Sequence, residues 1–446
     1  MACSPLCFHC QPQSARTTLR TLPPIPSSYG MIDNGVGVLS VQRACAPARA
    51  RAPARDRNAH ELAPKKPAMK RIVLAATAAA LLATNCFAES YIPFSYPDAA
   101  GGSTYLTGVR GVSGGPSDQV YISGVYTPLG SAGTQGLTYQ GSITSNTGSW
   151  YALNYPGDGV ETITSTALYG PNNLGAGIRV VGSYKTGTSA ADIGVMYEGP
   201  VSGIGGTWTK LQVSGSINTI AHSNYGNLAV GNYDTQLDEG RAFVYNINAG
   251  SFSDLTFSGI TPTSWTAYGI WQNPNGSYVI AGGFSLTPSV TGLDQGYIVD
   301  YDAATGLSSN FRAYNFGDNP VTSVISHFDG ITSDGHDGFN LTGDWIGAGE
   351  SEEGGLAFFA HVGRSADGSF TAAEWLSLSY PGEGNGPTSG NTVYEKYVLG
   401  IYVPDGGVPQ GYVATVPEID PNSLGSVLAL GLGSLGLLER RRLKTA

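Results

Sequence analysis

The densest group of side chains that could bind a metal lies in the stretch SDGHDGFNLTGD, at residues 333–344. It places Asp334, Asp337 and Asp344 in one glycine-rich segment, and oxygen ligands in a flexible loop suit Ca²⁺. The stretch lacks alternating aspartates and a terminal bidentate glutamate, and Asp-Gly pairs are ordinary turn formers. We therefore expect a solvated loop, with Asp334, Asp337 and Asp344 as the calcium candidate and no other cofactor.

The sequence contains no recognisable catalytic motif. A glycosidase needs two carboxylates at a defined separation, but no motif singles out a pair among the 27 acidic residues of the segment 89–415. A Ser-His-Asp hydrolase would carry a G-x-S-x-G elbow, and none accompanies the histidines of this segment. His222 and His327 occupy similar positions in their surroundings, so we expect them to be strand-end side chains. No catalytic residue is predicted.

The stretch SADGSFTAAEW, at residues 365–375, resembles the Asp-box turns of sialidase-type propellers. Those boxes are structural hairpins, so the resemblance implies no glycosidase activity. Two related stretches, SNTGSW and GIGGTW, lack the aspartate. We expect Asp367 and Gly368 to form a turn between two strands.

The elements that would position any site are short strands. The chain has 446 residues with 63 Gly, 25 Tyr and only 13% charged residues, which is typical of short, glycine-punctuated strands rather than helices. An octet at residues 150–157, WYALNYPG, returns at residues 375–382 as WLSLSYPG. A degenerate copy, YIPFSYPD, begins at Tyr91.

Four sequence pieces recur along the segment 89–415, and the second ends in a glycine followed by an aromatic residue. Its glycines are Gly124, Gly182, Gly231, Gly283, Gly343 and Gly400. Their intervals of 49 to 60 residues accommodate four short antiparallel strands each. The aromatic residues are Tyr126, Tyr184, Tyr233, Phe284, Trp345 and Tyr402. We expect these rings to pack between units, with stacking on sugar rings as the alternative.

The sixth unit supplies only three of the four pieces, and the octet copy at the front supplies the fourth. We therefore predict an all-β, six-bladed β-propeller over residues 89–415, closed by the strand at Tyr91–Pro97. Closure would cover the backbone groups and the apolar face that an open array exposes. The alternatives are an open β-solenoid or two β-sandwiches. The repeats also resemble, loosely, those of other exported bacterial propellers.

The front of the chain indicates export. The run from Met69 has a basic start, an apolar stretch and small residues before Ala88, as a signal peptide does. We predict a signal peptide at 69–88 that is cleaved after Ala88, translation from Met69, and a disordered or wrongly assigned leader at 1–68. The alternative for the leader is a basic interaction arm. All five cysteines precede the cleavage point, so no disulfide can form in the exported part.

The other end, residues 416–446, combines Pro417 and Glu418 with an apolar stretch and a basic cluster, Arg440, Arg441 and Arg442. This order resembles the PEP-CTERM sorting signal, although Ile419 replaces the second proline. The resemblance implies transient insertion of a C-terminal helix in the inner membrane. It also implies processing by an exosortase-type enzyme and delivery to the cell surface, outer membrane or extracellular matrix.

The net charge of the segment 89–415 limits the kinds of partner that it can bind. The segment 89–415 has eight basic against 27 acidic side chains, which argues against binding to nucleic acid. From the export signals and the absence of a catalytic motif, we predict a non-enzymatic binding or structural propeller whose partners are exopolysaccharide or surface proteins. The alternative is a secreted carbohydrate-active enzyme of glycosidase type on the same scaffold. A pair of carboxylates at the centre of the ring would distinguish the enzyme.

Overall fold

The computed structural model describes residues 89–417 except 188, 190, 237–239, 287–294, 319–322, 349–354 and 383–385. The predicted leader, the signal peptide with Ala88, and the sorting residues Glu418, Arg440, Arg441 and Arg442 lie outside the described residues. In the described part, no helix has the length and apolar character needed to cross a bilayer.

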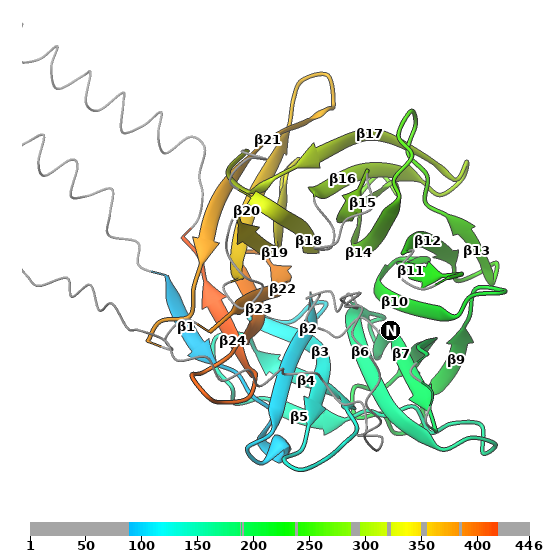
Figure 1. The fold of residues 1–446 in the computed structure, drawn as a ribbon, viewed down its shortest axis with the longest axis vertical. Helices are drawn as coiled ribbons and strands as arrows, with labels where there is room; N and C mark the ends of the chain where they lie inside the picture. The colour runs from blue at the N-terminus through cyan, green and yellow to red at the C-terminus, as the bar shows by residue number, and fades with distance from the viewer. Residues whose placement is uncertain are drawn as a thin grey trace, which may run out of the picture. The chain divides into compact units, whose positions relative to one another are not determined.

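The described chain forms six antiparallel sheets of four strands each, arranged in a ring (Figure 1). We number them as blades 1 to 6, starting from β2. Blade 1 contains β2 (Ser103–Gly111), β3 (Gln119–Thr127), β4 (Gln135–Ser142) and β5 (Ser149–Ala152). Blade 2 contains β6 (Ile163–Asn173), β7 (Ile178–Thr186), β8 (Ile193–Gly199) and β9 (Thr207–Leu211). Blade 3 contains β10 (Asn218–Tyr225), β11 (Leu228–Asp234), β12 (Arg241–Asn246) and β13 (Ser251–Asp254).

The second half of the ring repeats this pattern. Blade 4 contains β14 (Ser264–Gln272), β15 (Tyr278–Ser285), β16 (Gln295–Asp302) and β17 (Leu307–Tyr314). Blade 5 contains β18 (Ser323–Ser333), β19 (Phe339–Gly347), β20 (Leu356–Arg364) and β21 (Phe370–Leu378). Blade 6 contains β22 (Thr388–Tyr394), β23 (Tyr397–Tyr402), β24 (Gln410–Thr415) and β1 (Ser90–Pro93). The predicted six-bladed β-propeller is confirmed.

The ring closes with the strand predicted to close it. β1 pairs antiparallel with β24, and Pro93 lies opposite Tyr412. The Phe94 backbone N–H then donates to the Gly411 carbonyl at 2.8 Å. The Phe94 side chain is fully buried among residues of blades 1 and 6, including Leu106 and Val413. The two ends of the segment 89–415 therefore share one sheet.

Burial decreases from the centre of the ring to its rim. The first strand of each blade lies nearest the centre, and the fourth lies outermost (Figure 1). In blade 3, seven of the eight residues of the inner strand β10 are buried, whereas no residue of the outer strand β13 is. A strand buried on both faces needs small or apolar residues on both, which explains why alternation is weak in the inner strands.

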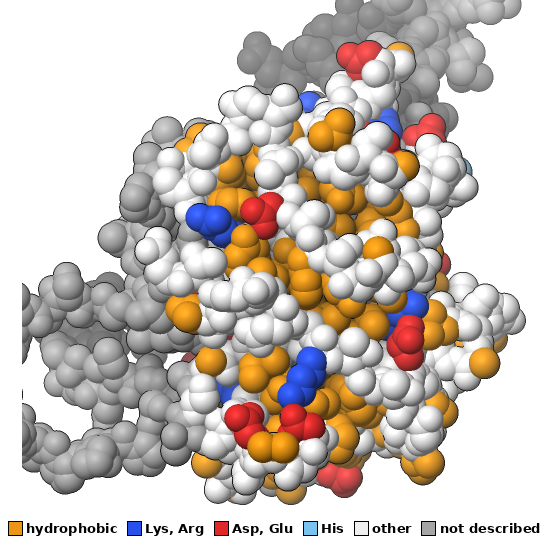
Figure 2. Space-filling view, turned by 90° about the vertical axis from the view of Figure 1, so that its right-hand side faces the viewer, with side chains coloured by type: hydrophobic (Ala, Val, Ile, Leu, Met, Phe, Trp, Pro, Cys, Tyr) orange, Lys and Arg blue, Asp and Glu red, His pale blue; other side chains and the backbone are white. Residues whose placement is uncertain are grey.

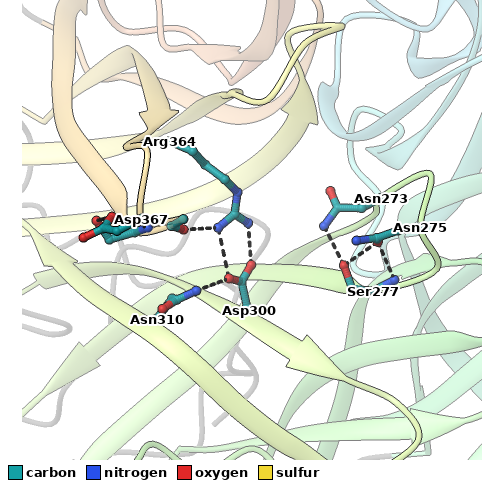
Figure 3. Close-up of polar contacts among 9 residues, drawn as sticks. Asn273, Asn275, Ser277, Asp300, Asn310, Arg364 and Asp367 are labelled. Atoms are coloured by element: carbon teal, nitrogen blue, oxygen red, sulfur yellow. Dashed lines mark hydrogen bonds and ion pairs between the residues drawn. The ribbon is translucent and has the colours of Figure 1, made fainter.

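Neighbouring blades are also linked by polar contacts near their turns. Arg364 at the end of β20 forms a bidentate ion pair with Asp300 of β16, at 2.5 and 3.0 Å (Figure 3). Asn310 donates to the same carboxylate at 2.7 Å. Asp367 accepts bonds from the backbone and the hydroxyl of Ser369, so the Asp-box-like stretch forms the expected turn.

Candidate active site

Each inner strand carries a β-bulge at the same level. The ladder between the first and second strands shifts register there in every blade, leaving a residue without an opposite partner. A bulge bends its strand and re-aims a side chain. The residues at the bulges of blades 1 to 6 are Thr107, Tyr169, His222, Tyr268, Asp329 and Asn391. We call these six residues the axial ring.

The recurring glycine of the sequence exists because of this bulge. In blade 3, a Cβ atom on Gly231 would lie 2.0 Å from the Ile220 carbonyl oxygen, and the other blades repeat this close approach. In blade 4 the residue in this role is Gly282, which pairs with Ala267 at the bulge, so the assignment to Gly283 is corrected by one position. The repeat therefore conserves the room for the bulge and leaves the axial side chain free to vary.

Contacts connect residues of the axial ring, or residues next to them, across several blades. Ring centroids lie 5.0 Å apart between Tyr169 and His222, and 4.7 Å apart between His222 and Tyr268. The next contact runs from Tyr268 to His327, at 5.7 Å. Asn391 of blade 6 donates to the Leu106 carbonyl at 3.0 Å. Side chains from different blades thus converge on one place.

Arg110 crosses the axis next to this ring. It lies three residues after Thr107, and its guanidinium carbon is 4.7 Å from the ring centroid of Tyr225 and 5.0 Å from that of Trp271. These two aromatic residues lie three positions after the bulges of blades 3 and 4. Burial lowers the pKa of Arg110 to about 10, and cation–π contacts offset part of that cost. Arg110 therefore spans the axis on the side on which the inner strands end.

Blade 5 brings two carboxylates to the axial ring. Asp329 is the bulge residue of β18, and Asp344 lies on β19 opposite His327. His327, Asp329 and Asp344 each offer one nitrogen or oxygen atom, and these atoms all lie within 4.8 Å of one another. The His327 Nε2 atom is 3.4 Å from Asp329. Neither ring nitrogen of His327 has a hydrogen-bond partner, although the residue is buried.

Asp329 and Asp344 differ in their burial and in their hydrogen bonds. Asp344 is buried and accepts bonds from the Ser389 hydroxyl at 2.9 Å and the Gly390 N–H at 2.8 Å. Burial, reinforced by the charge of Asp329, raises the pKa of Asp344 to about 7. Burial alone would lower the pKa of His327, but the nearby carboxylates outweigh it and raise that pKa above its usual value. Asp329 is the less buried of the two acids.

The predicted calcium candidate is not formed. Asp334 accepts bonds from the backbone of His336 and Gly338 in the β18–β19 turn and lies 3.0 Å from His361. Asp337 is exposed in the same turn. Asp344 is six ladder pairs away from that turn, at the axis. The physical reason is the hairpin itself, because a strand extends by about 3.3 Å per residue and carries Asp344 away from the turn.

The three side chains at the axis could hold a divalent cation, since they combine one imidazole with two carboxylates. A cation requires deprotonated ligands, whereas burial favours the protonated form of Asp344 near neutral pH. A carboxyl group that holds its proton near neutral pH, beside a second carboxyl group, suits acid–base chemistry.

Both axial histidines differ from their expected place at strand ends. His222 lies inside β10 at the bulge, and its Nε2 atom is 2.7 Å from the Asn232 side-chain oxygen. Burial lowers the pKa of His222 to about 4, so its ring is neutral at pH 7. His327 lies two residues before the bulge of its own strand and is therefore not equivalent to His222. The recurring glycine of the second strand, Gly231 in blade 3 and Gly343 in blade 5, lies opposite the inner strand close to each histidine. This glycine is the sequence signal that could have placed His222 and His327 near the bulges.

No family model matches the chain, and no curated protein sequence does. Solved structures with a similar fold include a luciferin-regenerating enzyme, at 10% identity and a TM-score of 0.42, covering 74% of this chain and 96% of that one. An α-L-arabinanase from Penicillium chrysogenum, bound to arabinobiose, has 11% identity and a TM-score of 0.41, with 74% and 99% covered. An α-L-arabinofuranosidase from Fusarium graminearum has 9% identity and a TM-score of 0.41, with 74% and 98% covered.

The prediction of a non-enzymatic binding or structural ring is contradicted. The centre of this ring holds the paired carboxylates that were to distinguish the enzyme. The similar structures have TM-scores near 0.4 and about 10% identity, so they carry no argument about activity. Any argument for activity therefore depends on the side chains at the axis.

Proposed function

We propose that the chain is an exported carbohydrate-active enzyme of glycosidase type, with Asp329 and Asp344 as its carboxylate pair. The observation that carries this proposal is the convergence of these two acids with His327 at the axis, within 4.8 Å of one another. Hydrolysis of a glycosidic bond uses two carboxyl groups, one as the acid and the other as the base or nucleophile.

Each carboxylate has a distinct part in this proposal. Asp344, whose pKa is about 7, holds the proton that the leaving sugar oxygen needs. Asp329 is more exposed and faces the anomeric carbon as a base or nucleophile. The charge of Asp329 also keeps the proton on Asp344, which couples the two roles.

The separation of the pair favours double displacement. Retaining glycosidases place their carboxyl groups about 5–5.5 Å apart, whereas inverting enzymes need about 6.5–9.5 Å to admit a water molecule. One oxygen atom of Asp329 and one of Asp344 lie no more than 4.8 Å apart, which is shorter than the inverting separation and compatible with the retaining one. We therefore infer a covalent sugar ester on Asp329, formed as the leaving oxygen takes the proton of Asp344. Water then cleaves the ester and returns that proton.

Sugar recognition has support in the axial ring. Tyr169 and Tyr268 lie beside the histidines there, and flat aromatic faces suit the C–H surfaces of sugars. The excess of acidic residues in the segment 89–415 disfavours anionic polymers. A neutral extracellular polysaccharide is thus the substrate class we propose.

Export and sorting belong to the same proposal. The signal peptide at 69–88 and the PEP-CTERM-like tail at 416–446 would place the enzyme at the cell surface or in the extracellular matrix, after processing by an exosortase-type enzyme. A polysaccharide-cleaving enzyme would meet its substrate there.

The test is the release of reducing sugar ends from the extracellular polysaccharide of the producing cells. Wild-type protein is expected to release them, and Asp329→Asn and Asp344→Asn are each expected to lose at least a thousandfold. Asp367→Asn is the matched control, because Asp367 lies in an exposed turn. Binding without release by the wild type, or full activity in Asp329→Asn, would refute the proposal.

A further inference from the structure

The sixth position of the octet fills the joint between successive blades. In five of the six octets this position is aromatic. These residues are Tyr96, Tyr155, Phe257, Phe316 and Tyr380. In the octet after β9 the same position is Val213. The joint between blades 2 and 3 therefore receives a much smaller side chain.

At the other joints this aromatic residue is a wedge between two rings of the next blade. Tyr155 lies 4.3 Å from Tyr184 and 5.5 Å from Trp208, measured between ring centroids. Phe316 stacks on Trp345 at 4.1 Å and contacts Trp375 at 5.4 Å. The other three wedges also contact aromatic residues of the following blade, as follows: Tyr96 with Tyr126 and Trp150, Phe257 with Tyr297 and Phe311, and Tyr380 with Tyr402 and Tyr91.

At the exceptional joint the two rings remain and the wedge is missing. Tyr233 and Phe252 of blade 3 occupy the places of Tyr184 and Trp208. Beside them lies a groove with a volume of about 570 Å³, which Val213 also lines. Figure 2 faces the edge of the ring on which β9 and β13 lie, and hydrophobic side chains are visible there between polar ones. The groove is thus a consequence of one residue type in one repeat.

Polar groups surround the aromatic floor of this groove. Lys210, Gln212 and Asp254 line it and are exposed. The Tyr233 hydroxyl donates to Asp254 at 2.8 Å. Phe252 is held by edge contact with Phe243, whose ring centroid is 5.1 Å away. A rigid apolar floor with a polar rim is typical of a site for a small amphipathic ring.

We propose that this groove binds one sugar ring of a glycan chain, in the space that an aromatic wedge fills at the other joints. A pyranose has nearly the size of that wedge, an apolar face for Tyr233 or Phe252, and hydroxyl groups for the rim. We favour a sugar over an aromatic side chain of a partner protein because a sugar ring can use the apolar floor and the polar rim of Lys210, Gln212 and Asp254 together, whereas an aromatic side chain uses only the floor. The site is distinct from the axis and serves to hold the polymer on the enzyme.

The test is affinity electrophoresis through gels that contain the extracellular polysaccharide. Val213→Tyr restores the wedge, and we expect its retardation to fall at least tenfold in apparent affinity relative to wild type. Val213→Thr has nearly the volume of valine and is the matched control, with retardation kept. Thermal unfolding of both variants verifies that they fold.

The result is separable from the proposed activity. Val213→Tyr and Val213→Thr are therefore also compared in the Asp329→Asn background, in which the polymer is not cleaved during the run and only Val213→Tyr should lose retardation. A folded Val213→Tyr protein that migrates like wild type would overturn the inference, and so would a wild-type protein that the polysaccharide does not retard. Displacement of the protein by tyrosine-containing peptides but not by oligosaccharides of the same polymer would equally overturn it.

Discussion

At the residue scale, the proposed function depends on side chains that meet at the bulge of blade 5, Asp329 from the bulge itself and Asp344 from the neighbouring strand. The axial ring contains Asp329 and His222 at equivalent positions, and their chemistry is set by burial rather than by a motif. Burial raises the pKa of Asp344 to about 7 and lowers that of His222 to about 4. Desolvation disfavours the charged form in both cases.

The pKa of Asp344 predicts the pH dependence of activity. If Asp344 must carry a proton to act as the acid, kcat/KM falls about tenfold for each pH unit above pH 7. The measurement is initial rate against pH on the extracellular polysaccharide, with unfolding followed at each pH as the control. A rate that stays constant from pH 7 to pH 9 would show that Asp344 is not the acid.

Burial of neutral His222 predicts a loss of stability in acid. Its folded-state pKa of about 4 lies below the ordinary histidine pKa of about 6.5, so the unfolded chain binds a proton first as the pH falls. The protein keeps its full free energy of unfolding with respect to His222 above pH 6.5. Between pH 6.5 and pH 4 the protonation of this residue in the unfolded chain lowers that free energy by about 3 kcal/mol. His222→Gln lacks this term. In urea unfolding, the stability of the variant relative to wild type should rise as the pH drops through this window; an unchanged difference would contradict the assignment.

At the element scale, each blade pairs a bulge with a glycine. The carbonyl oxygen that precedes the bulge approaches the second strand closely, and a side chain at Gly231 would collide with it. The sequence reveals the glycine as a regular repeat, whereas the axial residue differs in every blade. For this reason the sequence predicts the position of the glycine. It does not predict which residues the bulges bring to the axis.

Gly231→Ala should destabilise the fold. The new Cβ atom would lie 2.0 Å from the Ile220 carbonyl oxygen, which is backbone and cannot rotate away. We expect a loss of about 1–3 kcal/mol of unfolding free energy. Gly363→Ala in β20 is the control, because its Cβ atom would have 3.5 Å to its nearest neighbour. Equal stability of the two variants in denaturant unfolding would contradict the role of the glycine.

At the scale of the whole molecule, the ring is completed by β1, which pairs with β24 although more than 300 residues separate the two strands in the sequence. The octet repeat allowed this closure to be predicted, because five complete units and an incomplete sixth leave one copy at the front. The candidate site could not be predicted, because the calcium candidate rested on residues close in sequence. Asp344 and Asp329 meet instead through strand pairing, and Ser389 joins them from blade 6.

Loss of the closing contact should weaken the whole ring. Phe94 is fully buried beside Leu106 and Val413, so Phe94→Ala should cost about 3–5 kcal/mol of unfolding free energy. Hydrogen exchange should then rise first in blades 6 and 1. Ile204→Ala is the control, because Ile204 is 80% exposed. Exchange that rises evenly in all blades, or a stability equal to that of the control, would argue against closure at this joint.

The most direct measurement of the central claim is rescue of Asp329→Ala by azide. Removal of the carboxylate should abolish cleavage of the extracellular polysaccharide, and azide should restore it by attacking the anomeric carbon in place of Asp329. Mass spectrometry should then find products that end in a glycosyl azide. An Asp329→Ala protein that cleaves the polymer at the wild-type rate without azide would contradict the claim that the axial carboxylates form the active site.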